Sequence, residues 1–179
     1  MATTLNDTSR NEKAFELMDE LSRASWYANA GEANAQTEEQ LEQILKRLQV
    51  ENYELKWAKK NEASELVNEF TFQNSELWNR LKDIPDQLQE KIEQAGREEQ
   101  LTTLLEWVPE LVYLAAFDHA YKTFEDEKLI QYLVVHGMYI SFMACIAELA
   151  GDDTFEPLVE MVKEGHIPLG IKGNTIYLL

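Results

Sequence analysis

The sequence predicts an all-α protein, a bundle of about six to seven helices around a central apolar helix over 127–150, with a short C-terminal β-hairpin. Apolar residues recur at helical spacing, three and four apart, along most of the chain. Seven glycines and four prolines in 179 residues favour long regular elements over a loop-rich β design. The run from Leu129 to Ala147 is nearly all apolar, which is typical of a helix buried on every side. The length suits a single domain over residues 1–179.

The first predicted helix follows an N-terminal segment, residues 1–9, that we expect to be flexible. Ser9 and Glu12 have the spacing of a capping box, in which each side chain binds a free amide of the first helical turn. Small and polar residues over 29–34, with a glycine among them, predict a loop that ends this helix.

The second predicted helix begins at Thr37, with Gln40 completing another capping-box pair. It either ends at Asn61 or continues through Phe70. Its predicted inward stripe is Leu41, Ile44, Leu45, Leu48 and Leu55, with Tyr53 and Trp57 beside it.

Two prolines divide the middle of the sequence. A helix opening at Asn74 and Ser75 must be interrupted or restarted at Pro85, because proline lacks a backbone amide and fits best in a first turn. Pro109 is expected to separate a helix over 101–108 from one over about 110–125. The residues expected to pack inward from the latter are Leu111, Val112, Leu114, Ala115 and Phe117.

The C-terminal third begins with Asp126, which is expected to cap the central apolar helix. A short helix over 154–163 follows, with Pro157 in its first turn. Residues 166–179 then change in character, since two apolar stretches flank Gly173 and Asn174, which both tolerate positive φ. This pattern predicts a hairpin docked on the bundle, because two strands alone are only marginally stable in water.

The apolar run of the central helix nearly meets the length test for a membrane span. Acidic residues flank both of its ends, however, and no cluster of lysine or arginine would set an orientation. We therefore expect a buried helix and no membrane attachment. The N-terminus has no basic and apolar segment of a signal peptide, and the single Cys145 fits a reducing compartment, so the expected location is the cytoplasm.

Charge restricts the range of partners. The formal net charge is −17, from 33 acidic and 16 basic side chains. A protein that binds nucleic acid neutralises phosphates with a basic surface, so direct nucleic-acid binding is not expected. An acidic surface can serve solubility alone or attract a basic partner. The candidate contact acids are Glu38, Glu39, Asp86, Glu90, Glu93, Glu98 and Glu99.

The motifs of the chemistries that helical proteins commonly host are absent from the sequence. No Glu-x-x-His turn is present, which excludes a ferritin-like di-iron centre. One cysteine cannot supply a structural zinc set, and no phosphate-binding Gly-x-x-x-x-Gly-Lys loop occurs. Cys145 lies among apolar neighbours, which would raise its pKa and silence it as a nucleophile. We predict no catalytic, cofactor-binding or metal-binding residues.

One polar cluster remains open to a functional interpretation. If the helices over 110–125 and 127–150 pack antiparallel, His119 and His136 could approach each other, with Asp118 beside them. Such a pair could bind a metal or transfer protons. The alternative is a core histidine that is satisfied by a tyrosine or a carbonyl group.

In general character the chain resembles small bacterial interaction proteins, among them immunity proteins, antitoxin-like inhibitors and anti-defence inhibitors. The resemblance rests on the short helical chain, the acidic excess and the appended hairpin, and on no motif. It implies a non-catalytic protein-binding module, an inhibitor or immunity/antitoxin-like protein, that engages a basic protein partner. The alternatives are an oligomeric scaffold, such as a homodimer closed by exposed Trp26, Tyr27 or Trp107, and an enzyme or small-ligand protein around His119 and His136.

Overall fold

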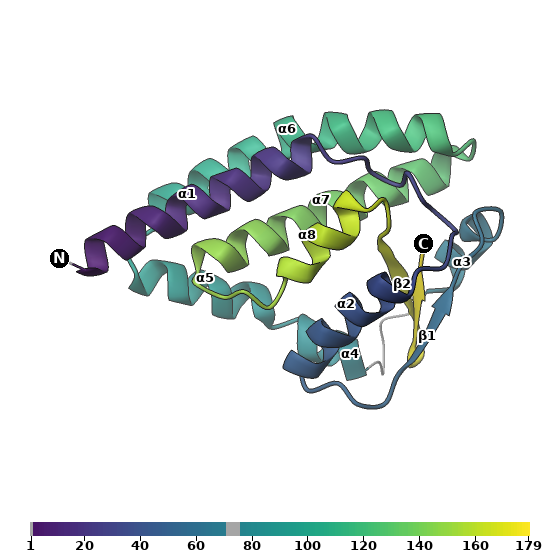
Figure 1. Ribbon diagram of the computed structural model, residues 1–179, viewed down its shortest axis with the longest axis horizontal. Helices are drawn as coiled ribbons and strands as arrows, with labels where there is room; N and C mark the ends of the chain where they lie inside the picture. Colours follow the sequence, from purple (N-terminus) through teal and green to yellow (C-terminus); the bar gives the residue numbers. More distant parts are fainter. Residues whose placement is uncertain (1, 71–75) are drawn as a thin grey trace.

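The computed structural model describes residues 2–70 and 76–179 (Figure 1). They form eight helices and one three-stranded sheet, which confirms the mostly helical class, the central apolar helix and the C-terminal hairpin. The helices are α1 (Ala2–Ser22), α2 (Ala35–Arg47), α3 (Ala63–Glu69), α4 (Glu76–Leu81), α5 (Ile84–Gln94), α6 (Glu98–Thr123), α7 (Glu127–Leu149) and α8 (Glu156–Lys163), and the strands are β1 (Glu54–Trp57), β2 (Pro168–Lys172) and β3 (Thr175–Leu178).

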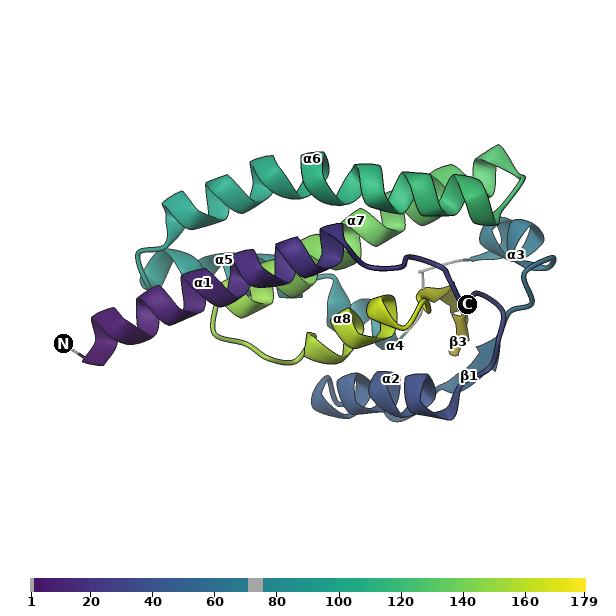
Figure 2. The ribbon, with the colours of Figure 1, turned by 45° about the horizontal axis from the view of Figure 1, so that its top comes forward.

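Helix α7 is the centre of the molecule. It contacts α1, α3, α5, α6 and α8, and in Figure 2 it lies between α6 above and α8 below (Figures 1 and 2). The side chain of Asp126 accepts a hydrogen bond from the amide of Lys128, as the predicted cap requires. Among the described residues α7 alone has the length and hydropathy of a membrane-spanning helix, and a little over half of its most apolar window is buried within the protein.

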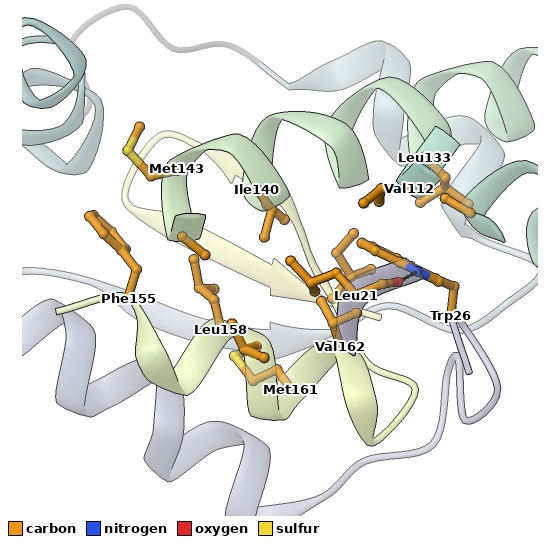
Figure 3. Close-up of a cluster of buried hydrophobic side chains, with 14 of the residues drawn as sticks. Leu21, Trp26, Val112, Leu133, Ile140, Met143, Phe155, Leu158, Met161 and Val162 are labelled. Atoms are coloured by element: carbon orange, nitrogen blue, oxygen red, sulfur yellow. Dashed lines mark hydrogen bonds between the residues drawn. The ribbon is translucent and has the colours of Figure 1, made fainter. Parts of the chain in front are cut away.

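The buried side chains form one core to which all eight helices and strands β2 and β3 contribute, and Figure 3 shows part of it. Leu21, Val112 and Leu133 are completely or almost completely buried there. Trp26 and Tyr27 belong to this core as well, each 1% exposed, so the expectation that they lie on the surface and close a dimer is wrong. Their polar atoms are satisfied inside the protein, since Trp26 Nε1 donates to the Leu21 carbonyl at 2.8 Å and the Tyr27 hydroxyl to the Leu133 carbonyl at 2.7 Å.

The hairpin is part of a larger sheet than the sequence predicts. Strands β2 and β3 pair antiparallel, and β1 pairs parallel with the other edge of β3, with Glu54 opposite Thr175. The predicted continuation of the second helix through Tyr53, Leu55 and Trp57 is therefore wrong. Along β1 exposed and half-buried residues alternate, as strand periodicity demands.

Helix boundaries differ from the predictions at further places. Asn34 rather than Thr37 caps α2, because the Asn34 side chain accepts hydrogen bonds from the amides of Gln36 and Thr37. Helix α1 begins at Ala2, so Ser9 lies within the helix and does not cap it. Helix α6 continues through Pro109, so the predicted break there is wrong. Asn74 and Ser75, predicted to open a helix, lie outside the described residues. Helix α5 has Pro85 in its first turn, and α8 has Pro157 in its first turn, as predicted.

Candidate functional site

The seven acids proposed for partner binding fall on three helices. Glu38 and Glu39 lie near the start of α2, Asp86, Glu90 and Glu93 on α5, and Glu98 and Glu99 in the first turn of α6. Six of the seven are exposed. The exception is Glu38, which is half-buried and accepts a hydrogen bond from Trp57 Nε1 at 2.9 Å. Glu38 is thus partly committed to the protein's own packing.

The structure does not join the three residues of the polar cluster. Asp118 is exposed and pairs with Lys122 on its own helix, at 2.9 Å from oxygen to nitrogen. His119 is half-buried on α6, whereas the His136 ring faces β2 and contacts the Pro168 carbonyl. Within residues 11–70 and 76–179 no group of three His, Cys, Asp or Glu side chains is placed to hold a metal ion.

His136 instead has the role of a satisfied core histidine. Its Nε2 lies 2.7 Å from the Pro168 carbonyl oxygen, which can only accept, so Nε2 carries the proton. Burial lowers the pKa of His136, and the hydrogen bond to Pro168 opposes this shift. The ring stacks on Tyr132, whose hydroxyl donates to the Leu169 carbonyl at 2.5 Å. Burial raises the pKa of Tyr132 to about 12. These two rings therefore attach α7 to β2 as neutral groups.

Cys145 lies in the buried part of α7. Burial, and to a smaller extent the charge of Glu148, raises the pKa of its thiol to about 12. A thiol in this state has almost no thiolate at neutral pH, as its apolar neighbours in the sequence predict.

An exposed apolar surface runs along α6, which we call the α6 face. Three of its rings form a ladder, because Tyr113 stacks on Phe117 and Phe117 on Tyr121, with centroids 5.9 Å apart in each pair. Leu114 is 68% exposed and Tyr121 66%. The α6 face consists of Leu105, Trp107, Leu111, Tyr113, Leu114, Phe117 and Tyr121.

The sequence predicts part of this face to lie in the core, and the structure differs. Leu111, Leu114 and Phe117 were expected to pack inward and are exposed. The helix is apolar on most of its circumference, so periodicity alone does not identify the buried side. The stripe that packs inward is Leu104, Val108, Val112, Ala116 and Ala120, at a strict spacing of four residues.

A second feature is an apolar cavity of about 640 Å³, which we call the α7 groove. Helices α2, α4, α7 and α8 and strands β2 and β3 supply its walls, so the groove joins two elements from the first half of the chain to the last four. His136 and Tyr132 lie in its wall, but His119 does not. The volume is within the range of small-molecule sites, about 300–1,000 Å³.

Comparisons of the chain with protein-family models, with curated proteins and with solved structures gave no match. The α6 face and the α7 groove are therefore the two candidate functional sites of the described residues.

Proposed function

We propose that this protein is a non-catalytic protein-binding module, of the inhibitor or immunity/antitoxin-like kind, that engages a basic protein partner in the cytoplasm through the α6 face. The observation that carries the proposal is the exposed ladder of Tyr113, Phe117 and Tyr121. Contiguous exposed apolar side chains on a soluble protein commonly mark an interaction surface. Helix α6 forms an outer edge of the molecule in Figure 2, where a partner can reach it.

The residue types on this face are those that dominate binding energy. Trp and Tyr are enriched among residues whose truncation costs a complex about 2 kcal/mol or more. Trp107 is 49% exposed and Tyr121 66%, so both retain surface that a partner can bury. Because the three stacked rings already restrain one another, they lose less side-chain freedom on binding than isolated exposed rings would.

The charges around the face define the chemistry of the partner. Exposed acids border it, whereas the nearby Lys122 is paired with Asp118. A complementary partner has an apolar groove with lysine or arginine at its edges, since opposite charges speed encounter and improve selectivity. The bordering acids on α6 are Glu98, Glu99, Glu106, Glu110 and Asp118.

A second copy of the chain is the alternative occupant of the α6 face. Each copy has a formal net charge of −17, so a homodimer brings two strongly acidic molecules together. The acids of α6 would meet the same acids of the other copy in a symmetric arrangement. Charge therefore favours a basic partner over self-association.

The test is affinity capture from a lysate of the source organism with the wild-type protein and two single variants, Leu114→Asp and Tyr121→Asp. Val135→Asp is the matched control, because Val135 is 61% exposed on α7 and does not belong to the α6 face. Circular dichroism and thermal unfolding first establish that all four proteins fold alike. We expect wild type and Val135→Asp to capture the same basic protein in a 1:1 ratio.

Each α6-face variant should weaken that complex at least tenfold, since it places a charge in an apolar contact. Raising the salt from about 50 mM to about 300 mM should also weaken it, because screening then acts over several ångströms rather than more than ten. Capture that is equal for Leu114→Asp and wild type would remove the α6 face from the proposal. A partner with no basic surface, or a homodimer in light scattering that Leu114→Asp dissociates, would replace the basic-partner proposal with its alternatives.

A further inference from the structure

The α7 groove is elongated along one helix. The residues of α7 that line it extend from Lys128 to Met143. At a rise of 1.5 Å per residue this segment is about 22 Å long. Gln131, Val135 and Tyr139 also line the groove, are exposed, and recur every four residues, so the groove opens to solvent along one face of α7.

The walls of the groove are apolar and need no polar ligand to satisfy them. Leucine, isoleucine and aromatic side chains make up most of the lining. The Tyr132 hydroxyl and His136 Nε2 both lie in the wall, and both already donate to carbonyl groups of β2. A polar ligand would gain few hydrogen bonds here and would lose its hydration. The interior therefore favours an apolar ligand.

One end of the groove carries a positive charge in an otherwise acidic protein. Of the described residues that line the groove, none is acidic, and Lys128 is the only one with a permanent charge. Lys128 is exposed in the first turn of α7, at the end of the helix where the backbone dipole is positive. In the part of the chain that the structure describes, the Lys128 ammonium is in none of the ion pairs, and the adjacent Asp126 and Glu127 do not line the groove.

We propose that the α7 groove binds one free long-chain aliphatic carboxylate, with its tail along α7 and its carboxylate beside Lys128. The shape suits a single extended chain, and the charge suits an anionic head at one end only. This ligand site is separate from the α6 face and does not depend on the proposed protein partner.

The experiment compares two ligands of equal chain length by titration calorimetry on the full chain. Dodecanoate carries the negative head, and 1-dodecanol has the same tail without the charge. We expect saturable 1:1 binding of both ligands, with dodecanoate the tighter at about 50 mM salt. The preference for dodecanoate should shrink at about 300 mM salt.

Two pairs of variants locate the head and the tail. Lys128→Glu should weaken the binding of dodecanoate about tenfold and change the affinity for 1-dodecanol by less than about twofold. Lys91→Glu makes an equal charge change at an exposed site on α5 and should not change the affinity for either ligand. Val135→Asp should weaken both ligands at least fivefold, because it places a carboxylate in the apolar wall. Leu114→Asp on the α6 face should bind both ligands as the wild type does.

Three results would overturn the proposal. The first is no saturable binding of either ligand, or binding of many molecules that Val135→Asp does not reduce. The second is an equal effect of Lys128→Glu and Lys91→Glu, which would remove the carboxylate from Lys128. The third is a wild-type dimer that Val135→Asp dissociates, which would make the groove an interface between copies. Because Leu114→Asp and Val135→Asp serve as each other's control, loss of partner binding and loss of ligand binding are distinguishable.

Discussion

Gly137 is the residue of α7 that faces the buried rings of Trp26 and Tyr27, which lie in the turn after α1. A Cβ atom at this position would lie 2.9 Å from Trp26 Cζ3 and 3.1 Å from the Tyr27 hydroxyl oxygen. Neither ring can move freely, because the Trp26 nitrogen and the Tyr27 hydroxyl each donate to a buried carbonyl group. Only glycine fits this contact without displacing one of those hydrogen bonds.

Gly137→Ala is therefore expected to destabilise the protein although alanine is the better helix former. Helix propensity favours alanine by about 1 kcal/mol, whereas overpacking a rigid core costs about 1–3 kcal/mol. We expect a net loss of up to about 2 kcal/mol in the free energy of unfolding, measured by urea titration. Gln131→Ala, at an exposed site on the same helix, should change stability by less than about 0.5 kcal/mol. A gain in stability for Gly137→Ala would show that the ring pair can shift.

His136 makes stability depend on pH. Its pKa in the folded protein is lowered by burial below the usual value of 6.5. As pH falls through 6.5 the unfolded chain takes up a proton at this residue before the folded protein does, so the free energy of unfolding decreases. This decrease in the free energy of unfolding is absent well above pH 6.5. It is complete below the pKa of His136 in the folded protein.

The variant His136→Gln does not titrate and retains an amide that can donate to the Pro168 carbonyl. Between pH 7.5 and pH 5.5 the free energy of unfolding should fall more for wild type than for His136→Gln. Urea titrations of both proteins at both pH values measure the difference, in which the contributions of the shared carboxylates cancel. An identical decrease in the two proteins would contradict a lowered pKa at His136.

Among the elements, α6 is a continuous helix that lacks one backbone hydrogen bond in its interior. Pro109 has no amide to donate to the Leu105 carbonyl, yet the helix extends from Glu98 to Thr123. The inward stripe on either side of Pro109 packs on α7 and α1, and this burial maintains the helix across this position. Local sequence rules predict a break here because they do not include that tertiary packing.

Pro109→Ala is expected to stabilise the protein. The substitution restores one backbone hydrogen bond and removes the clash of the proline ring with the preceding turn, a difference of about 1–3 kcal/mol. The control is Pro157→Ala in the first turn of α8, where the amide has no helical partner, so a gain is not expected. Thermal unfolding of both variants checks this expectation, and a loss of stability for Pro109→Ala would mean that the ring itself is required.

The helices were predictable where periodicity coincided with a local boundary signal. Asp126 at the start of α7 and Pro157 in the first turn of α8 are such cases. Strand β1 was not predictable, because four residues give little periodicity and their partner, β3, lies far along the chain. Local sequence therefore specified individual elements better than their pairing.

The two candidate surfaces illustrate the same limit. The α6 face was missed because a helix that is apolar on most sides does not reveal which side the bundle covers. The α7 groove was not predictable, because its walls come from six elements and exist only after those elements pack. The two histidines show the opposite error. Helix geometry predicts that they lie close together, but His136 packs against β2 instead.

At the scale of the whole molecule, acidic charge and apolar surface are distributed differently. The chain carries 33 acidic side chains, yet within residues 11–70 and 76–179 none of them lines the α7 groove. Acids do border the α6 face. The two surfaces therefore differ in local charge. The acids beside the α6 face attract a cationic partner, whereas the mouth of the α7 groove has a local positive charge.

The parallel pairing of β1 with β3 has a kinetic consequence. Helices α6 and α7 are neighbours in sequence and can dock after a short loop closes, within the fast range of local contacts. Glu54 and Thr175 must instead find each other across most of the chain, and the entropy cost of closing a loop rises with its length. During that search the unpaired edge of β1 is open to strands of other molecules. We therefore expect the yield of refolding to fall as the protein concentration rises. The time that the sheet takes to form, rather than the helices, should govern this fall.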